Sequence, residues 1–186
     1  MKKDKLRAWA LKKRMGMSEQ EVRAKSALIC QKLLNFLKEK QEKRVMLYYA
    51  IRNEVDLKPL AIRLLTLGYK ISLPVVKNEG IIPVSIDHYD RCCKKGYKGI
   101  YEPCLLEGRI VHKNEIDAVV VPGIAFNQRG YRVGYGKGFY DHFLKSLKAI
   151  KLGAAYNWQI ISFKEEEYDV PVDIVFTENS VLRREK

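Results

Sequence analysis

The sequence is poor in the residues that build disulfide or metal frameworks. Its 186 residues include only four cysteines and three histidines, and no two cysteines are spaced as Cys-x-x-Cys. A structural zinc site is therefore not expected. Cys92 and Cys93 are adjacent and could pair only with strain. Reduced thiols in a cytoplasmic protein are the simplest account of this cysteine content.

Long apolar runs are also missing. No stretch approaches the roughly 20 apolar residues that a membrane-spanning helix needs, so we expect no membrane partner. The opening Met-Lys-Lys-Asp-Lys is followed by no apolar run, which predicts that the chain carries no signal peptide. There is no internal repeat, linker or low-complexity tract.

What is present suits one globular domain over residues 1–186. Apolar residues make up 47% and charged residues 31% of the chain, which excludes a disordered protein. The net charge of +13 indicates polyanionic partners, such as a nucleotide, a polycarboxylate ligand or nucleic acid. Mixed-charge runs such as residues 38–44 are equally typical of a solvated helix end.

Hydrophobic periodicity predicts strands and helices in alternation. We expect helices over residues 4–15, 19–40, 60–67 and 139–149, and a short helical stretch at 158–163. We expect strands at residues 45–50, 69–76, 82–86, 117–121, 151–156 and 174–177, with a basic turn at 91–99. This order favours an α/β fold, a three-layer α/β/α domain whose mostly parallel sheet has helices on both faces.

Three residues mark expected helix ends. Ser18 stands three residues before Glu21, the spacing of a capping box. Asp56 could cap the helix around residues 60–67, and Gly68 would end it.

A glycine-rich segment between a strand and a helix is the most informative feature. It contains two cations and four glycines, namely Arg132, Lys137, Gly130, Gly134, Gly136 and Gly138. A loop that leads from a strand into a helix can turn backbone N–H groups toward a phosphate. The spacing matches neither the dinucleotide fingerprint nor the Walker A motif. The alternative is a mobile surface loop without a ligand.

Carboxylates near this loop are candidates for a metal. Asp141 falls in the first turn of the following helix, where it could hold Mg²⁺ together with phosphate oxygens, or could only stabilise the helix N-terminus. Asp169 could supply a second carboxylate, or could belong to an ordinary turn containing Asp and Pro.

Two further segments carry suitable side chains. Lys3 and Arg7 share a helix face, although a solvated basic helix explains them as well. The segment Asn53-Glu54-Val55-Asp56 follows the first expected strand, where ligands bind in open α/β sheets. A carboxylate there could accept hydrogen bonds from a heterocycle, or Asp56 could merely cap a helix.

With these residues assembled, the sequence resembles the 5-formyltetrahydrofolate cyclo-ligase family, also called methenyltetrahydrofolate synthetases. The strongest match runs from Pro122-Gly-Ile-Ala-Phe-Asn through Gly130-Tyr-Arg-Val-Gly-Tyr-Gly-Lys-Gly-Phe-Tyr-Asp141. Weaker matches lie at Lys3 to Arg7 with Arg14, at residues 53–56, at Gly153 to Gln159, and at Asp169 to Asp173 leading to Thr177-Glu178. Together they span nearly the whole chain.

The resemblance implies ATP-dependent conversion of 5-formyltetrahydrofolate to 5,10-methenyltetrahydrofolate, with Mg²⁺ required and ADP and phosphate released. Apart from the resemblance, we expect a monomer in the cytoplasm that binds no nucleic acid, and the basic charge balance suits a substrate that carries one or more glutamate carboxylates. ATP would be contacted by Lys3, Arg7, Arg132, Val133, Gly134, Tyr135, Gly136, Lys137, Gly138, Phe139 and Tyr140. Folate would be contacted by Ile51, Asp56, Tyr135, Gly136, Lys137, Gly138 and Phe139. Arg132 and Lys137 would be catalytic, and Asp141 and Asp169 would hold Mg²⁺.

Three positions depart from the family pattern. The family often has Met at Ile51, Glu or Asn at Asp56, and Tyr at Phe139, so this chain lacks one hydroxyl at its folate contacts. Two competing interpretations remain. One is a nucleic-acid binder using the N-terminal helices and the turn at 91–98, whose affinity would fall steeply with salt. The other is a different ATP-using enzyme on the same fold.

Overall fold

The structure is a computed structural model of the single chain. It describes residues 2–77, 80–89, 93–95, 101–103 and 109–184. Within these ranges, no helix is both long enough and apolar enough to cross a membrane.

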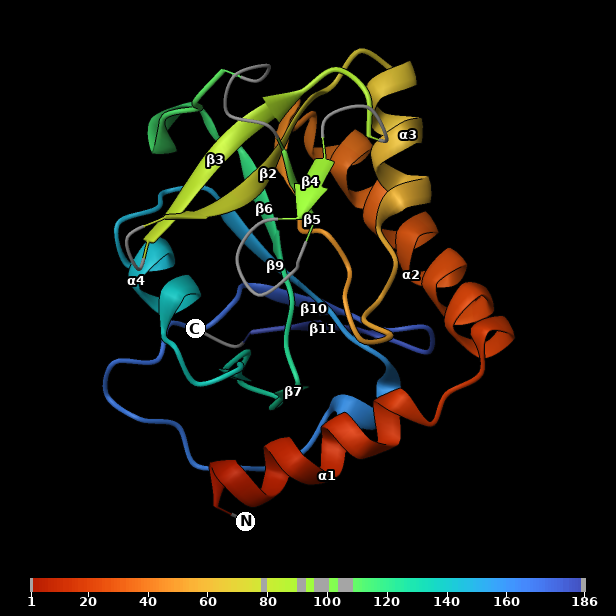
Figure 1. Ribbon diagram of the computed structural model, residues 1–186, viewed down its shortest axis with the longest axis vertical. Coiled ribbons are helices and arrows are strands. Elements are labelled where there is room, and N and C mark those ends of the chain that lie inside the picture. Colours follow the sequence, from red (N-terminus) through yellow and green to blue (C-terminus); the bar gives the residue numbers. More distant parts are fainter. Residues whose placement is uncertain (1, 78–79, 90–92, 96–100, 104–108, 185–186) are drawn as a thin grey trace.

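A seven-stranded sheet forms the middle of the molecule (Figure 1). Its strands in spatial order are β11 (Val181–Arg183), β10 (Ile174–Phe176), β9 (Ile150–Ala154), β6 (Ala118–Val121), β1 (Arg44–Met46), β2 (Lys70–Lys77) and β3 (Gly80–Ile86). The strands from β10 to β2 run parallel, whereas β11 and β3 pair antiparallel at the two edges. The predicted, mostly parallel sheet is confirmed.

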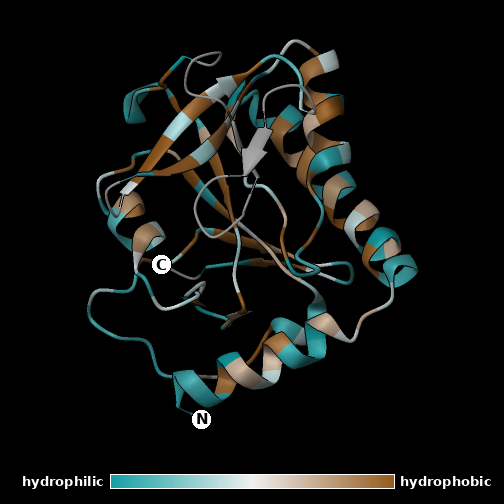
Figure 2. Ribbon diagram, viewed as in Figure 1, coloured by the Kyte–Doolittle hydropathy of each residue, from teal (hydrophilic) through white to brown (hydrophobic). Residues whose placement is uncertain are grey.

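Helices cover both faces of this sheet, which confirms the three-layer architecture. They are α2 (Glu19–Lys40) and α3 (Lys58–Thr66) on one face and α4 (Phe139–Lys145) on the other. The first helix of the chain is α1 (Lys3–Met15). Alternate strand residues point to opposite faces: Val45 packs in the core formed with α2 and α3, and its neighbour Met46 packs in the core formed with α4. Figure 2 shows hydrophobic residues concentrated on the sheet, with hydrophilic residues on the outer helix surfaces.

The first helix lies apart from these layers, at the end of the sheet where β6 leads into β7 (Figure 1). A small cluster holds it there, in which Leu6 packs with Ala125, Val133 and Phe163. The cluster includes a short hairpin of β7 (Ala125–Phe126) and β8 (Arg132–Val133). Because the carboxyl ends of parallel strands open at this edge, α1 closes over the usual ligand-binding end of such a sheet.

The remaining pieces of secondary structure are short. A second hairpin pairs β4 (Cys93–Lys95) with β5 (Tyr101–Pro103), and two 3-10 turns are η2 (Lys113–Glu115) and η3 (Asn157–Gln159). The basic turn expected at 91–99 lies largely outside the described residues. The helical stretch expected at 158–163 is wrong after Gln159, because the N–H of Ile161 donates instead to the carbonyl of Phe126.

The predicted helix ends are partly confirmed. Gly68 ends α3 with a φ of +79°, and the next N–H, of Tyr69, donates to Leu64 at 3.0 Å, as in a Schellman motif. At the other end of α3 the N-cap residue is Leu57. Asp56 lies one position earlier, and its carboxylate accepts a hydrogen bond from the N–H of Lys58 at 3.0 Å.

Two predicted elements are shorter than expected. The strand expected at 45–50 ends at Met46, because the chain turns away through Arg52 and Asn53, whose φ angles are +49° and +57°. The helix expected at 139–149 ends at Lys145. There the ammonium of Lys113 binds the carbonyl of Phe143, one of the last carbonyls of the helix.

The capping box at Ser18 is confirmed and predicts a measurable stability effect. The Ser18 hydroxyl accepts from the N–H of Glu21 at 3.2 Å, and the Glu21 carboxylate accepts from the N–H of Ser18 at 3.0 Å. We expect Ser18→Ala to lower the free energy of unfolding by about 1 kcal/mol, measured by urea denaturation. Arg23→Ala, which removes only an exposed pair with Glu19, is the control. Equal stability of Ser18→Ala and the unmodified protein would contradict a stabilising cap.

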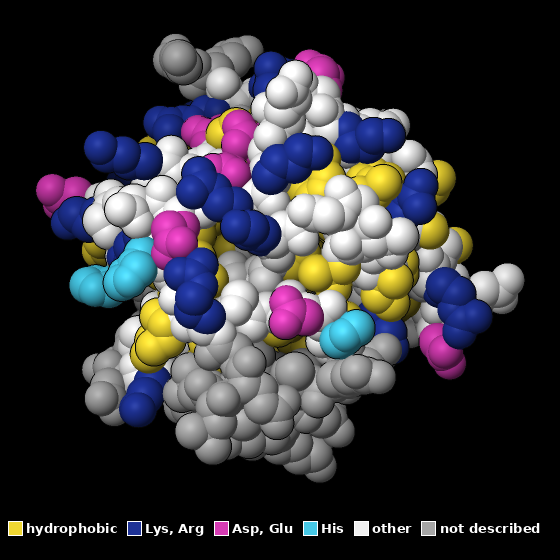
Figure 3. All heavy atoms as spheres, turned by 90° about the horizontal axis from the view of Figure 1, so that it is seen from above, with side chains coloured by type: hydrophobic (Ala, Val, Ile, Leu, Met, Phe, Trp, Pro, Cys, Tyr) yellow, Lys and Arg dark blue, Asp and Glu magenta, His cyan; other side chains and the backbone are white. Residues whose placement is uncertain are grey.

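Surface charge is mostly positive but mixed. On the face shown in Figure 3, Lys and Arg side chains are widespread, and several lie beside Asp or Glu. Ion pairs such as Arg44 with Asp117 and Arg109 with Glu115 account for part of the basic surface.

Candidate active site

Three cations on one face of α1 point into the molecule. Lys3, Arg7 and Arg14 are separated by four and seven residues, so they share a helix face. Lys3 lies between two carboxylates, Arg7 reaches the glycine loop, and Arg14 is almost completely buried, with 1% of its surface exposed. The three cations are thereby distributed along the end of the sheet where the carboxyl ends of the parallel strands lie.

The glycine loop connects β8 to α4 and passes beside this helix. Gly136 and Gly138 have φ angles of +91° and +68°, a conformation that favours glycine. The Nε of Arg7 donates to the carbonyl of Gly134 at 2.8 Å, which ties the loop to α1. Lys137 is exposed, and within the described part of the chain its ammonium has no hydrogen bond or ion pair. The loop therefore presents a cation and glycine main chain to solvent.

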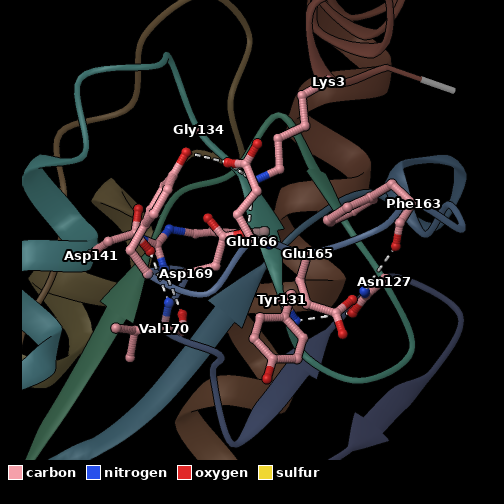
Figure 4. Close-up of polar contacts among 12 residues, drawn as sticks. Lys3, Asn127, Tyr131, Gly134, Asp141, Phe163, Glu165, Glu166, Asp169 and Val170 are labelled. Atoms are coloured by element: carbon pink, nitrogen blue, oxygen red, sulfur yellow. Dashed lines mark hydrogen bonds and ion pairs between the residues drawn. The ribbon is translucent and has the colours of Figure 1, made fainter.

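Arg132 is buried at the base of the loop, where it holds Asp141. One guanidinium nitrogen lies 3.0 Å from Oδ1 of Asp141, and another donates to the carbonyl of Val170 at 3.1 Å. The N–H of Val170 donates to the same Oδ1 at 3.1 Å (Figure 4). Burial lowers the pKa of Arg132, and the Asp141 carboxylate opposes that shift. The arginine fixes the orientation of the carboxylate that the sequence nominates for the metal.

The second nominated carboxylate, Asp169, lies beside the N-terminus of α1. Its Oδ2 accepts from the ammonium of Lys3 at 2.6 Å and from the N–H of Glu166 at 2.8 Å. Lys3 also pairs with Glu166 at 2.8 Å (Figure 4). The structure thus brings Lys3, Asp141 and Asp169 to one region around Val170.

These two carboxylates suit Mg²⁺, which proteins often hold through one or two carboxylates while phosphate oxygens and water complete the coordination. Within the described residues, Oδ2 of Asp141 and Oδ1 of Asp169 take no hydrogen bond, so each has an oxygen left to coordinate a cation. Over the same residues, no group of three or more His, Cys, Asp or Glu side chains is arranged to hold a metal alone. A metal at these two carboxylates would need further ligands, such as phosphate oxygens and water.

A pocket of about 350 Å³ lies beside the loop. Its wall includes Ile51 and Asp56, the two residues nominated for folate, and the rings of Tyr49 and Tyr89, stacked at 5.4 Å. The other lining residues are Val22, Ala50, Arg52, Asn53, Glu54 and Lys58. Flat aromatic walls with a few polar groups suit a heterocyclic ligand.

Two residues absent from the predicted site connect the pocket to the loop. Arg14 and Glu54 form a buried ion pair at 3.5 Å, and the Tyr135 hydroxyl of the loop lies between them. Burial raises the pKa of Glu54, and the charge of Arg14 opposes the rise. The helical spacing from Arg7 could have placed Arg14 on the inward face. No sequence signal identifies Glu54 rather than Asp56 as the buried carboxylate.

The predicted residues therefore fall into two adjoining groups. Lys3, Arg7, Arg132, Asp141 and Asp169 surround the glycine loop, while Ile51 and Asp56 line the pocket. Phe139 begins α4, and the ring of Tyr140 lies 5.7 Å from the Arg132 guanidinium.

Comparison with known proteins identifies the family of the chain. Residues 1–178 match the sequence profile of the 5-formyltetrahydrofolate cyclo-ligase family. The chain belongs to this family. The family name confirms the resemblance and the enzyme class predicted from the sequence.

Relatives of the cyclo-ligase family match along nearly their whole length. A 5-formyltetrahydrofolate cyclo-ligase from Mycoplasma pneumoniae is 31% identical over 96% of this chain and 99% of its own. A second, from Haemophilus influenzae, is 28% identical over 92% and 95%.

Solved structures of the cyclo-ligase family show the same fold. The 5,10-methenyltetrahydrofolate synthetase of Aquifex aeolicus superimposes with a TM-score of 0.88 at 38% identity, covering 100% of this chain and 94% of the other. The Mycoplasma pneumoniae synthetase gives a TM-score of 0.81 at 30% identity, covering 96% and 99%. Family and neighbours together support conversion of 5-formyltetrahydrofolate to 5,10-methenyltetrahydrofolate.

Proposed function

We propose that this chain uses ATP and Mg²⁺ to convert 5-formyltetrahydrofolate to 5,10-methenyltetrahydrofolate, releasing ADP and phosphate. The observation that carries the proposal is the juxtaposition of a cation-lined glycine loop with an aromatic pocket. Tyr135 belongs to the loop, and its hydroxyl contacts Glu54 of the pocket wall at 3.1 Å. A nucleotide on the loop would therefore lie next to a heterocycle in the pocket.

The triphosphate would lie against the glycine loop. Lys137 and Arg7 supply positive charge there, and Gly134, Gly136 and Gly138 leave room for a ligand to approach the main chain. A Cβ built at Gly134 or Gly138 would meet nothing within 4 Å, so the space outside these residues is open. This open side is where phosphate oxygens would be received.

The folate would occupy the pocket lined by Ile51 and Asp56. The carboxylate of Asp56 can accept hydrogen bonds from N–H groups of a pterin, and Ile51 offers an apolar contact. Phe139 has no hydroxyl, and both oxygens of Glu54 already accept hydrogen bonds within the protein, so the proposed pocket relies on Asp56 as its carboxylate acceptor. Cations near the opening suit the glutamate carboxylates of the substrate, whether one or several.

The chemistry proceeds by phosphoryl transfer and ring closure. The formyl oxygen attacks the γ-phosphorus of ATP, the bond to the β-γ bridging oxygen breaks, and ADP leaves. The resulting iminium phosphate is attacked at the formyl carbon by N10 of the folate, which loses its proton as the ring closes. Loss of phosphate then gives the methenyl product. No protein nucleophile is required.

The protein residues contribute positioning and charge stabilisation, which phosphoryl transfer chiefly demands. Lys137 would neutralise charge on the transferring group, and Arg132 would keep Asp141 in place. Bound Mg²⁺ would add charge neutralisation at the phosphates, held by Asp141 and, with it, Asp169.

We further propose that the enzyme works as a monomer in the cytoplasm without nucleic acid. Membership of the cyclo-ligase family supports a small anionic substrate in place of nucleic acid. Part of the positive net charge would then attract the anionic substrates.

The test is formation of the methenyl product from purified protein. With Mg²⁺, ATP and 5-formyltetrahydrofolate we expect the absorbance of the methenyl product to rise, with one ADP formed per product. Omitting ATP, or chelating the metal, should abolish the rise. A folded protein that forms no product under the complete conditions would refute the proposal, and salt-sensitive RNA binding in its place would favour the nucleic-acid interpretation.

A further inference from the structure

Tyr135, Glu54 and Arg14 form a buried polar link between the glycine loop and the pocket. The Tyr135 hydroxyl donates to Oε1 of Glu54 at 3.1 Å and accepts from a guanidinium nitrogen of Arg14 at 2.5 Å. Glu54 and Arg14 are 3% and 1% exposed. Buried polar groups of this kind are costly unless every member is satisfied, so a displacement of the Tyr135 hydroxyl also affects Glu54 and Arg14.

Glu54 joins the two proposed ligand sites through its two oxygens. Its Oε1 accepts the hydrogen bond from the Tyr135 hydroxyl, and its Oε2 accepts a hydrogen bond from the N–H of Ile51 at 3.1 Å. In return the N–H of Glu54 donates to the carbonyl of Ile51 at 2.9 Å. One carboxylate therefore fixes the backbone of a proposed folate contact and the side chain of a proposed nucleotide contact.

Arg14 holds the same turn from the side of α1. Its Nε donates to the carbonyl of Arg52 at 2.9 Å, and the Asn53 amide donates to the Arg14 carbonyl at 3.1 Å. Arg52 and Asn53 both have positive φ angles, and such residues persist when the surrounding contacts determine their conformation. Arg14 also donates to the carbonyl of Gly123 at 3.2 Å, at the end of β6.

We infer that Glu54 and Arg14 are positioning residues that couple nucleotide binding to folate binding through Tyr135. A nucleotide that orders the glycine loop places the Tyr135 hydroxyl, and this placement orders the turn at residues 51–54. A folate in the pocket orders the same turn and thus the loop. Once one ligand is bound, the second ligand loses less conformational entropy in ordering these residues. Binding of the two ligands is then positively cooperative. The inference rests on the proposed function.

Calorimetric titration with ADP tests the coupling. ADP has no γ-phosphoryl group to transfer, so it can be combined with 5-formyltetrahydrofolate and Mg²⁺ without reaction. In the unmodified protein we expect ADP to bind about tenfold more tightly when folate is saturating, within the usual range of such couplings. Folate affinity must rise by the same factor when ADP is saturating, because the linkage is reciprocal.

Tyr135→Phe is the decisive variant. It keeps the ring and removes the hydroxyl, on a loop residue that is 40% exposed, so the fold should survive. We expect the coupling factor to fall from about tenfold to within about twofold of unity. Tyr48→Phe is the matched control, since its hydroxyl bonds the carbonyl of Val55 at 3.0 Å and does not reach the loop. Tyr48→Phe should keep the full coupling.

Three results would overturn the inference. The first is unchanged coupling in Tyr135→Phe, and the second is equal loss of coupling in Tyr48→Phe. The third is independent binding of the two ligands to the unmodified protein, which would leave the proposed function intact. If neither ADP nor folate binds the unmodified protein, the proposed function itself fails and the coupling fails with it.

Discussion

Lys137→Ala is expected to lower kcat by at least about 100-fold while leaving the fold unchanged. The Lys137 ammonium is exposed and has no hydrogen bond or ion pair to other described residues, so its removal leaves no buried group unsatisfied. Its proposed task is to neutralise charge that develops on the transferring phosphoryl group, an effect of this size in other enzymes. Steady-state measurement of methenyl product formation gives kcat, and thermal unfolding gives stability.

A matched control separates this charge effect from general loss of positive surface. Lys145 is also an exposed lysine, located at the end of α4, and Lys145→Ala removes the same charge outside the loop. We expect it to retain kcat within about twofold, since long-range charge effects are screened. Full activity in Lys137→Ala, or an equal loss in Lys145→Ala, would remove the loop lysine from the proposed mechanism.

The layers of the fold were predictable because they depend on local patterns. Alternating strands and helices, the Ser18 capping box and the glycine at 68 all act within a few residues of sequence. Strand and helix ends were less accurate, because distant contacts decide them. Lys113, for example, binds the carbonyl of Phe143 at the end of α4 from 30 positions away.

The site was predictable where its residues are neighbours in sequence. The segment from Arg132 to Asp141 forms one loop and one helix start, so its motif identifies it as a unit. Lys3 and Asp169, nominated separately, prove to be in contact although 166 positions separate them. Spacing alone could not show this pairing, because only the packing of α1 across the sheet end creates it.

The buried link at Arg14 and Glu54 escaped prediction for a related reason. Both residues look like surface charges, since charged side chains are seldom fully buried without a partner. Their partner is each other, together with Tyr135, and the chain separations are 81 positions for Glu54 and 121 for Arg14. A single sequence gives no signal for such a long-range pair.

Arg132→Ala is the second change with a large expected effect, and it should alter both activity and stability. The Arg132 guanidinium is 4% exposed and joins Asp141 to the carbonyl of Val170. Its loss leaves the Val170 carbonyl without this donor, and leaves Asp141 held, among the described residues, only by the N–H of Val170. We expect the free energy of unfolding to fall by about 2 kcal/mol, which is less than the cost of breaking a fully buried pair, because Asp141 is partly exposed. We also expect kcat to fall by at least about 100-fold, because Asp141 is no longer oriented.

The conservative variant Arg132→Lys distinguishes charge from geometry. Lysine keeps the charge but cannot present two donors in the fixed planar arrangement of a guanidinium. We therefore expect it to recover about half of the lost stability, while kcat stays at least about tenfold below that of the unmodified protein. Urea denaturation and the product assay measure the two quantities on the same samples.

If Arg132→Ala folds normally and turns over at the original rate, Arg132 does not position Asp141 for catalysis. If Arg132→Lys restores full activity, positive charge alone is sufficient at this position, and the two-donor geometry seen at Asp141 and Val170 has no part in the reaction.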